Sequence, residues 1–352
     1  MGELISYIIP CYNSEQTIAY CISSILDQNT NSMAEVIVVD SSNNMLTKRL
    51  IENYDNSNIK YYHSNRQLFA GQARNLGIAK STGNYCALID SDIIEILKTA
   101  KKLGIDTIDT AISYGNSLNR LGELGIRNFK IITKFPKIPD DRKKQTNWFN
   151  EQIESTLKQL DVNSLEAILL HYPKDILENK NSELIHFLLN LKNQGVTKKI
   201  GVSIYEKNEL DEILEIFKPE IIQCPINIFD NRLLEQNYLE KISNKGIEIH
   251  IRSIFLQGLL LFKKEEIPQE FLKYYNIWEE WYNWLNTTKL NPLEACIRYT
   301  NSLKSVDKIV VGINSAHQLK QITKYMRKPK LKKKPNWQNS ISKDLIDPRL
   351  WK

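Results

Sequence analysis

Short runs of β-branched residues alternate with helix-like patterns along most of the chain, and this alternation constrains the fold more than any other feature. Strands separated by helices form βα units, whose strands pair in parallel. In the first 92 residues the pattern predicts strands 5–9, 35–39, 59–63 and 85–89 and helices 14–26, 46–53 and 70–80. Parallel sheets bind ligands at the carboxyl ends of their strands, so polar residues at those positions are candidates for a site.

The alternation continues after residue 92 and predicts seven further strands: 107–111, 129–134, 166–171, 199–203, 220–224, 247–253 and 308–312. A closed (β/α)₈ barrel needs eight, and an open sheet exposes two edges, which proteins normally avoid. We therefore expect strand 85–89 and helix 93–103 to serve as the first βα unit of the barrel or to lie close to that position. The same strand also completes the first sheet, so it has two possible places.

Four ionisable residues follow successive strands of this second part: Asp109, Tyr114, Lys134 and His171. The carboxyl ends of barrel strands converge on one face, where active sites of this fold lie. A lysine beside a tyrosine lowers the pKa of the hydroxyl, an aspartate orients the lysine, and a histidine donates to a substrate carbonyl. Each residue alone has a plain structural explanation, such as a helix cap or a packed rim. The four together predict proton donation to a carbonyl that is reduced by a hydride-donating cofactor.

The motifs GIDTIDTAISYGNS, KIITKF, LLHYP, KIGVSIY, IIQCPINIFDNR, IRSIFLQGLL and VVGINSAHQL resemble the successive signatures of aldo-keto reductases, over residues 93–352. The resemblance implies a TIM-type barrel in which Asp109, Tyr114, Lys134 and His171 are the catalytic tetrad, with Tyr114 as general acid. It also implies a cofactor, NADP(H) or in some members NAD(H), bound without a Rossmann glycine loop.

The same resemblance implies the cofactor-binding residues. Ser203 and Gln223 match residues that hold the nicotinamide amide, and Arg252, followed by Ser253, falls where many members place an aromatic ring that stacks on the nicotinamide. The adenosine-phosphate site is matched by Gly312, Asn314, Ser315 and Gln318. This segment lacks a nearby arginine for a 2′-phosphate, so both NADP(H) and NAD(H) stay open.

The barrel departs from the family at its start. Members begin with a hairpin, a first strand and a long glycine-containing loop that lines the pocket, and this chain enters helix 93–103 directly. The RSIFLQGLL motif and the closing DPRLW resemble members encoded among surface-sugar biosynthesis genes, which implies a sugar-derived carbonyl substrate.

The first 92 residues resemble a different family, the GT-A glycosyltransferases of family 2, in SYIIPCYNSEQTIAYCISSILDQ, EVIVVDSS, LFAGQARNLGIAKSTGNY and CALIDSD. The resemblance implies a partial Rossmann-like sheet that binds a nucleotide-sugar through Pro10, Tyr12, Asp40 and Asp90. Asp90 and Asp92 would hold a divalent metal such as Mn²⁺ or Mg²⁺ on the diphosphate. The position after Asp40 is Ser41 rather than an acid, and the acceptor half of such an enzyme is absent, so glycosyl transfer is not expected.

Charge and cysteine content limit the other classes of function. Seven basic residues cluster near the end of the chain: Lys324, Arg327, Lys328, Lys330, Lys332, Lys333 and Lys334. Their combined charge exceeds the net charge of +6, so the rest of the chain is close to neutral. Without interleaved aromatic residues this run predicts a solvated tail after the last helix rather than nucleic-acid binding. No apolar run is long enough to span a membrane. Five scattered cysteines without a CxxC motif predict unpaired thiols and a cytoplasmic location.

Taken together, the sequence predicts a fused protein with a partial nucleotide-sugar domain (1–92), a reductase barrel (93–325) and a basic tail (326–352). The predicted activity is NADP(H)-dependent reduction of a small-molecule carbonyl. Two alternatives stay open: a metal-dependent module that binds a nucleotide-sugar, and a fusion with neither activity.

Overall fold

The computed structural model describes residues 4–15, 18–26, 33–54, 56–68, 70–88, 93–139, 145–177, 182–331, 335–338 and 341–351. The chain folds into two compact units, each of which has its own sheet. The first unit comprises Met1–Gly104 and Ile313–Lys320, and the second comprises Ile105–Gly312 and Gln321–Lys352.

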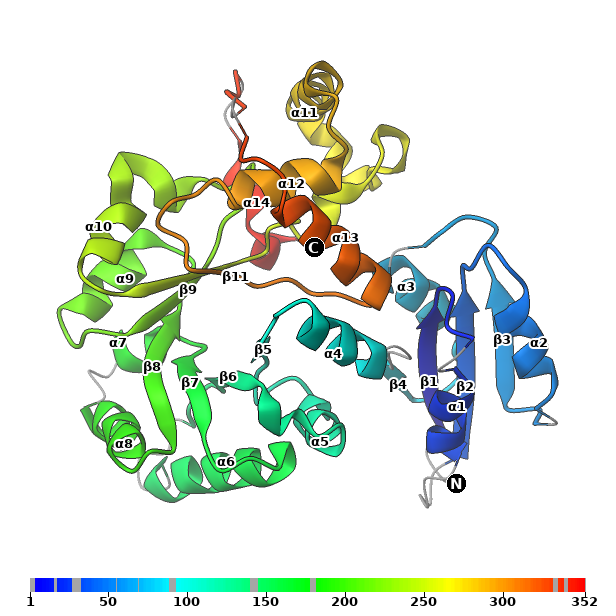
Figure 1. Ribbon diagram of the computed structural model, residues 1–352, viewed down its shortest axis with the longest axis horizontal. Helices are drawn as coiled ribbons and strands as arrows, with labels where there is room; N and C mark the ends of the chain where they lie inside the picture. Colours follow the sequence, from blue (N-terminus) through cyan, green and yellow to red (C-terminus); the bar gives the residue numbers. More distant parts are fainter. Residues whose placement is uncertain are drawn as a thin grey trace. The chain divides into compact units, whose positions relative to one another are not determined.

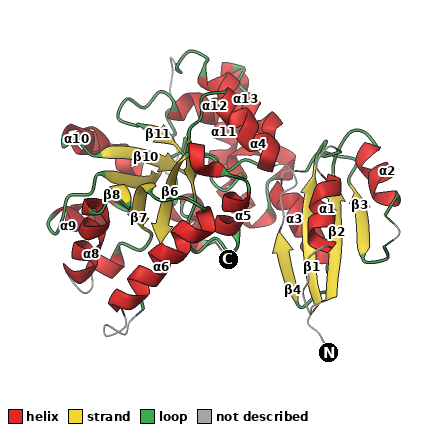
Figure 2. Cartoon of the chain, turned by 60° about the horizontal axis from the view of Figure 1, so that its bottom comes forward, coloured by secondary structure: helices red, strands yellow, loops and turns green. Residues whose placement is uncertain are grey.

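The first unit contains a four-stranded parallel sheet in the order β3-β2-β1-β4. Its elements are β1 (Leu4–Cys11), α1 (Ile18–Leu26), β2 (Met33–Asp40), α2 (Leu46–Glu52), β3 (Ile59–His63), α3 (Ala70–Lys80), β4 (Tyr85–Leu88) and α4 (Ile93–Lys102). Figure 2 shows the four strands side by side with helices beside them. The predicted βα order of this part is confirmed.

Both faces of this first sheet are covered, because successive side chains of a strand point to opposite faces. Ile9 of β1 packs with Ile18 and Ile22 of α1 on one face. Ile8, its neighbour in β1, packs with Ala73 of α3 on the other face. The continuous apolar strands in the sequence therefore reflect a sheet that is buried on both sides.

Strand β4 belongs to the first sheet, where it pairs with β1 from Ile5↔Tyr85 to Ile8↔Leu88. The connection from α3 is short and fixed, since the amide of Gly83 donates to Ser6 Oγ (2.9 Å) and that of Asn84 to the carbonyl of Leu4 (2.8 Å). The expectation that strand 85–89 would pair into the barrel as its first strand is therefore wrong, whereas the alternative that it lies close to that position stays a prediction. Of its two possible places, it occupies the one beside β1.

The second unit contains a seven-stranded parallel sheet in the order β11-β10-β9-β8-β7-β6-β5, which confirms the predicted strand count. Its strands are β5 (Thr107–Asp109), β6 (Lys130–Phe135), β7 (Leu165–Leu170), β8 (Thr197–Ser203), β9 (Ile221–Pro225), β10 (Glu248–Arg252) and β11 (Lys308–Ile309). Its helices are α5 (Ser117–Glu123), α6 (Gln145–Leu160), α7 (Lys174–Leu177), α8 (Ser182–Asn193), α9 (Lys207–Leu214), α10 (Tyr238–Asn244), α11 (Tyr275–Thr288), α12 (Pro292–Thr300) and α14 (Lys343–Ile346), while α13 (Ala316–Met326) spans the division between the units.

The strands of the second unit follow one another in chain order, with α6, α8, α9 and α10 on the outside (Figure 1). Each strand from β6 to β10 is paired on both sides. Among the described residues no strand pairs with the outer edge of β5 or of β11. The sheet is thus a barrel that lacks one strand.

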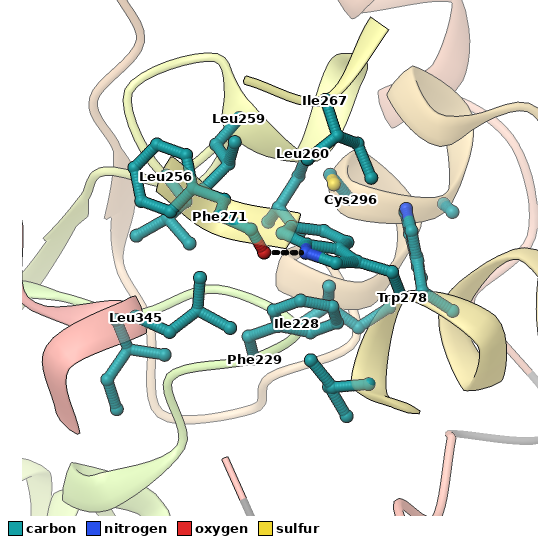
Figure 3. Packing of buried hydrophobic residues seen from close by; sticks show 14 of the residues in the cluster. Ile228, Phe229, Leu256, Leu259, Leu260, Ile267, Phe271, Trp278, Cys296 and Leu345 are labelled. Atoms are coloured by element: carbon teal, nitrogen blue, oxygen red, sulfur yellow. Dashed lines mark hydrogen bonds between the residues drawn. The ribbon is translucent and has the colours of Figure 1, made fainter. Parts of the chain in front are cut away.

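A large cluster of buried apolar residues, several of them aromatic, includes side chains of α11 and α12 (Figure 3). We call it the aromatic cluster. Trp278 and Trp281 of α11 are buried against Phe229, and the Trp278 indole donates to the carbonyl of Phe271 (2.9 Å). The hydrogen bond satisfies the polar edge of a ring that is otherwise surrounded by apolar groups.

The end of the chain is solvated as predicted only in its basic run, where Arg327 and Lys330 are exposed. The short helix α14 follows the basic run, and its Leu345 and Ile346 are buried in the aromatic cluster. Lys328 forms an ion pair with Glu294 of α12 (2.8 Å), whereas 332–334 lie outside the described residues. Helix α13 is therefore not the last helix of the chain, which the sequence predicted it to be.

Two further predictions concern the cysteines and the membrane. None of the five cysteines, all within the described ranges, forms a disulfide, as the sequence predicted, and Cys11, Cys224 and Cys296 are buried. In the described part of the chain, every helix is too short or too polar to cross a bilayer. The cytoplasmic location stays a prediction.

Candidate active site

The ends of three neighbouring strands place the first residues of the candidate site. Asp109 ends β5, Lys134 lies near the end of β6, and His171 directly follows β7. The parallel register pairs Asp109 with Ile132 and Lys134 with Leu169, so the three side chains come from adjacent strands at the same edge of the sheet. This is the face on which the sequence predicted that they would meet.

A buried ion pair forms the centre of this group. Lys134 is 2% exposed, and its Nζ donates to the carboxylate of Asp109 and to the carbonyl of Thr110 (3.0 Å). The other oxygen of Asp109 accepts from Gln223 Nε2 (2.7 Å), which is contributed by β9. Strand ends on opposite sides of the barrel therefore converge on one carboxylate.

Tyr114 lies in the loop after β5, and its side chain is half-exposed. Its ring packs edge-on against His171 with 6.3 Å between ring centroids. Lys134 Nζ lies 5.7 Å from the centre of the same ring. The structure thus brings together all four residues that the sequence singled out for catalysis.

Burial dominates the ionisation of this group. It raises the pKa of Tyr114 above its usual value of 10, and the charge of Asp109 raises it further. Burial also lowers the pKa of His171 below 6.5, with smaller contributions from the charges of Lys134 and Arg252. The pKa of Lys134 is lowered by burial and partly restored by Asp109. The Tyr114 pKa is therefore raised rather than lowered as expected, and the Lys134 ammonium is directed at Asp109 and Thr110.

Two buried polar atoms beside the ion pair have no partner within the described chain. Gln223 is 0% exposed, and its Oε1 accepts no hydrogen bond while its Nε2 is bound to Asp109. The second such atom is Nδ1 of His171. Buried polar atoms are normally paired, so an unpaired acceptor next to the buried Ser203 fits a ligand that carries an amide donor.

Arg252 ends β10 and stacks on the ring of Tyr205, with 4.2 Å between its Cζ and the ring centroid. Arg349 stacks on the same ring at 3.7 Å. Ser253 follows Arg252 with a positive φ of 58°, and its carbonyl accepts from Asn227 Nδ2 (3.2 Å). Tyr205 and Arg349 were not predicted as site residues from the sequence, although they lie in the KIGVSIY and DPRLW motifs.

The predicted adenosine-phosphate residues lie around the start of α13. Ser315 Oγ accepts from the amide of Gln318 (3.2 Å), and the Gln318 side chain accepts from the amide of Asn314 (3.0 Å). These bonds cap the helix and fix the segment locally. Gly312 belongs to the second unit, and the other three residues belong to the first.

The carboxyl end of β2 carries the candidate residue of the first unit. Asp40 is buried, and its Oδ1 accepts from the amide (2.9 Å) and the hydroxyl (2.5 Å) of Ser42. Its Oδ2 accepts from the hydroxyl of Tyr61 (2.8 Å). Each oxygen of Asp40 is therefore already bound by the chain itself.

The remaining predicted residues of this first unit are less defined. Pro10 lies near the end of β1, and Tyr12 lies in the loop that follows, where its amide donates to Ser14 Oγ (3.3 Å). Asp90 and Asp92 lie outside the described residues, and within the described ranges no group of three or more potential metal ligands occurs. The metal site stays a prediction.

Comparison with protein families gives a match over more than half of the chain. Residues 75–337 match the model of the aldo/keto reductase family. The chain belongs to the aldo/keto reductase family. Membership confirms the resemblance on which the tetrad was assigned, whereas the cofactor, the substrate and the roles of the individual residues stay proposals.

A second family model, that of glycosyl transferase family 2, matches residues 6–103. A glycosyltransferase segment therefore precedes the aldo/keto reductase domain. The two matches share residues 75–103, which contain most of α3 and all of β4 and α4. This shared segment is the part of the chain with two possible places, and in the structure its strand pairs with β1.

The relatives match in parts. An uncharacterized oxidoreductase, YtbE from Bacillus subtilis, is 30% identical over 179 residues, which cover 49% of this chain and 61% of YtbE. The UDP-Glc:alpha-D-GlcNAc-diphosphoundecaprenol beta-1,3-glucosyltransferase WfgD from Escherichia coli is 36% identical over 134 residues, covering 38% of this chain and 50% of WfgD. The chain thus spans less than two thirds of either relative's length.

Solved structures show the same fold. The aldo-keto reductase AKR11C1 from Bacillus halodurans superposes with a TM-score of 0.55 at 19% identity, covering 68% of this chain and 82% of that one. The open seven-stranded sheet is therefore most of an aldo/keto reductase barrel.

Proposed function

We propose that the chain is an NADP(H)-dependent carbonyl reductase in which Tyr114 donates the proton. The observation that carries the proposal is the hydrogen-bonded group of Asp109, Lys134 and Gln223, which three strand ends hold next to Tyr114 and His171. The substrate is a small carbonyl compound, and the motifs shared with sugar-biosynthesis members favour a sugar-derived one.

His171 and Tyr114 have different roles in the protonation of the substrate's carbonyl oxygen. His171, kept neutral by burial, donates an N–H to the carbonyl oxygen and orients it. Tyr114 gives its hydroxyl proton to this oxygen as negative charge develops there and becomes a phenolate. The ammonium of Lys134, which is bound to Asp109 and Thr110, lies 5.7 Å from the centre of the ring on which the negative charge develops. A bound nicotinamide supplies the hydride to the carbonyl carbon.

Two features favour a nicotinamide at this position. The unpaired Oε1 of Gln223 is an acceptor for a carboxamide N–H, and Ser203 at the end of the adjacent strand β8 supplies a hydroxyl. Ser253 and Gly312, which belong to the same unit as Gln223, would hold further parts of the cofactor. NADP(H) is proposed over NAD(H) on the family's usual preference.

Replacing Tyr114 by Phe tests this function. We expect Tyr114→Phe to lower kcat for NADPH-dependent aldehyde reduction about 100-fold or more, because general acid catalysis contributes that much. Its affinity for NADPH, measured by quenching of protein fluorescence, should equal that of the wild type. If the wild-type chain neither binds NADPH nor reduces aldehydes, the proposed function is wrong.

A second candidate function belongs to the first unit, where a glycosyltransferase segment places a fully buried carboxylate at a strand end. Asp40, with Pro10 and Tyr12, would bind the nucleoside of a nucleotide-sugar, and Asp90 and Asp92 would hold Mn²⁺ or Mg²⁺. Titration with UDP-glucose and Mn²⁺ tests it. Binding that is lost in Asp92→Ala would support the candidate, and absence of binding would refute it.

A further inference from the structure

The guanidinium of Arg252 has unused hydrogen-bond donors. It donates two long hydrogen bonds, one to Ser253 Oγ (3.5 Å) and one to the carbonyl of Ile204 (3.4 Å). A guanidinium carries five N–H donors. Stacking on Tyr205 holds its plane and leaves the in-plane donors free to bind a ligand.

Neighbouring arginines differ from Arg252 in one respect. Arg349, on the same Tyr205 ring, forms two bonds to the carboxylate of Asp347 (2.9 and 2.6 Å). Arg232 is bound to Asp230 (2.8 Å) and to Glu206 (2.8 Å). Within the described ranges no carboxylate lies at ion-pair distance from Arg252. Its partly buried charge is therefore uncompensated, which is costly unless an anion binds.

This charge lies within the candidate active site. It is close enough to Tyr114, Lys134 and His171 to contribute to their pKa shifts. The negative charge of Asp109 is already used by Lys134, so the site as a whole carries an excess positive charge. The fully buried Oε1 of Gln223, which has no hydrogen-bond partner within the described chain, is a second polar group left for a ligand in this site.

We propose that Arg252 selects carbonyl substrates that carry an anionic group, a carboxylate or a phosphate, a few atoms from the carbonyl. This rests on the proposed reductase function and names its substrate class. The planar guanidinium group can donate two parallel hydrogen bonds to either a carboxylate or a phosphate. His171 and Tyr114 then hold the carbonyl end of the substrate, and Arg252 holds the anionic end.

The kinetic test compares charged and uncharged aldehydes of similar size. The carboxylate arm uses succinic semialdehyde against butanal, and the phosphate arm uses glyceraldehyde 3-phosphate against glyceraldehyde. In the arm that matches the natural anion, we expect kcat/KM for the charged aldehyde to be about 10- to 100-fold higher, as for a charged hydrogen bond. Arg252→Gln should lower kcat/KM for the charged aldehyde far more than for the neutral one and so remove this preference, and Arg252→Lys should retain part of it.

A matched control removes the other cation on the same ring. The double variant Asp347→Asn/Arg349→Gln eliminates the Arg349 charge without leaving Asp347 unpaired, and the preference for the charged aldehyde should persist. A preference that survives in Arg252→Gln, or a loss that is equal for charged and neutral aldehydes, would overturn the proposal.

A binding measurement separates this proposal from the reductase function. Titration calorimetry compares two pairs of alcohols, 4-hydroxybutyrate with 1-butanol and glycerol 3-phosphate with glycerol. Each titration is done once without cofactor and once with NADPH, which cannot reduce an alcohol. Tighter binding of a charged alcohol that depends on Arg252 supports the proposal even if NADPH does not bind. If NADPH binds and neutral aldehydes are reduced but neither charged compound is preferred, the inference fails and the reductase function stands.

Discussion

At the residue scale, the site combines a tyrosine and a histidine whose pKa values are moved apart. Burial raises the pKa of Tyr114 above 10 and lowers that of His171 below 6.5. The hydroxyl therefore keeps its proton, and the imidazole stays neutral, over the whole range between these values. A proton donor and a neutral hydrogen-bond donor are what carbonyl reduction requires.

This separation predicts the pH dependence of the proposed reaction. Since a general acid must be protonated to act, kcat for reduction should be constant between pH 6.5 and 10 and should decrease only at higher pH. The measurement is kcat at saturating NADPH and aldehyde across this range. An alkaline decrease centred near pH 8 would contradict the prediction and would show that Lys134 does lower the Tyr114 pKa.

The sequence predicted which residues meet in the site and missed part of what they do. Asp109, Lys134 and His171 follow strands whose parallel order was readable, so their convergence was predictable. The link from Gln223 to Asp109 joins residues 114 positions apart and depends on the curvature of the sheet. The stacking of Arg252 and Arg349 on Tyr205 likewise arises only when strand ends and the end of the chain come together.

At the element scale, buried polar groups fix the register of the first sheet. Glu35 of β2 accepts from Ser6 of β1 (2.5 Å) and from the amide of Thr82 (3.0 Å), and forms an ion pair with Lys60 of β3. Burial alone would raise the Glu35 pKa, but these hydrogen bonds outweigh it and lower the pKa to about 2. One carboxylate therefore connects three elements.

The lowered pKa predicts a loss of stability in acid. Its contribution is complete above the ordinary glutamate value of 4.5 and is lost as pH falls from 4.5 towards 2. By linkage it amounts to about 3 kcal/mol. Urea unfolding followed by circular dichroism should show Glu35→Gln less stable at pH 7 and less sensitive to acid. Lys60→Met should move the acid loss to higher pH, and an unchanged acid profile in both variants would contradict this role.

Two glycines of α3 offer a matched comparison of packing. A Cβ at Gly77 would collide with Cγ2 of the buried Ile8 in β1, whereas a Cβ at Gly71 would meet nothing within 4 Å. Alanine normally stabilises a helix relative to glycine by about 0.5–1 kcal/mol, and overpacking costs about 1–3 kcal/mol.

We therefore expect Gly71→Ala to stabilise the protein slightly and Gly77→Ala to destabilise it. Chemical denaturation of both variants, compared with the wild type, measures the difference. If Gly77→Ala were as stable as Gly71→Ala, α3 would not pack on β1 as closely as the structure shows.

Several helices were predicted within a few residues, and the misses have local causes. Helices 70–80 and 93–103 coincide almost fully with α3 and α4. Helix α5 was not predicted because its sequence follows Gly115 and contains Gly122, and glycine weakens a helical pattern. Helix α14 has only four residues, which is too short for a periodic signal.

At the scale of the whole molecule, the segment 75–103 matches both family models. Hydrogen bonding determines which of the two sheets its strand joins. The strand count predicted a barrel one strand short, and the structure confirms it. What the sequence could not decide was which sheet would take β4, because its apolar residues suit either. The short connection from α3, together with the bonds of Gly83 and Asn84 to β1, favours the first sheet.

An open edge on β5 predicts an alternating pattern of amide exchange along one strand. The amide of Thr110 donates to the carbonyl of Ile132 (2.8 Å), and that of Ile112 donates to the carbonyl of Lys134 (3.1 Å). Amides in a strand point alternately to its two sides, so those of Thr107 and Asp109 face the side on which no described strand pairs.

Hydrogen exchange measured by NMR should therefore be at least about 10-fold faster for Asp109 than for Thr110, because exchange of a paired amide requires local opening. Central strands β7 and β8, paired on both sides, should exchange slowly at every position and serve as the internal reference. In a closed barrel both amides would be protected alike. Equal protection of Asp109 and Thr110 would thus show that another strand fills the gap, and its dependence on protein concentration would tell whether a second copy of the chain supplies that strand.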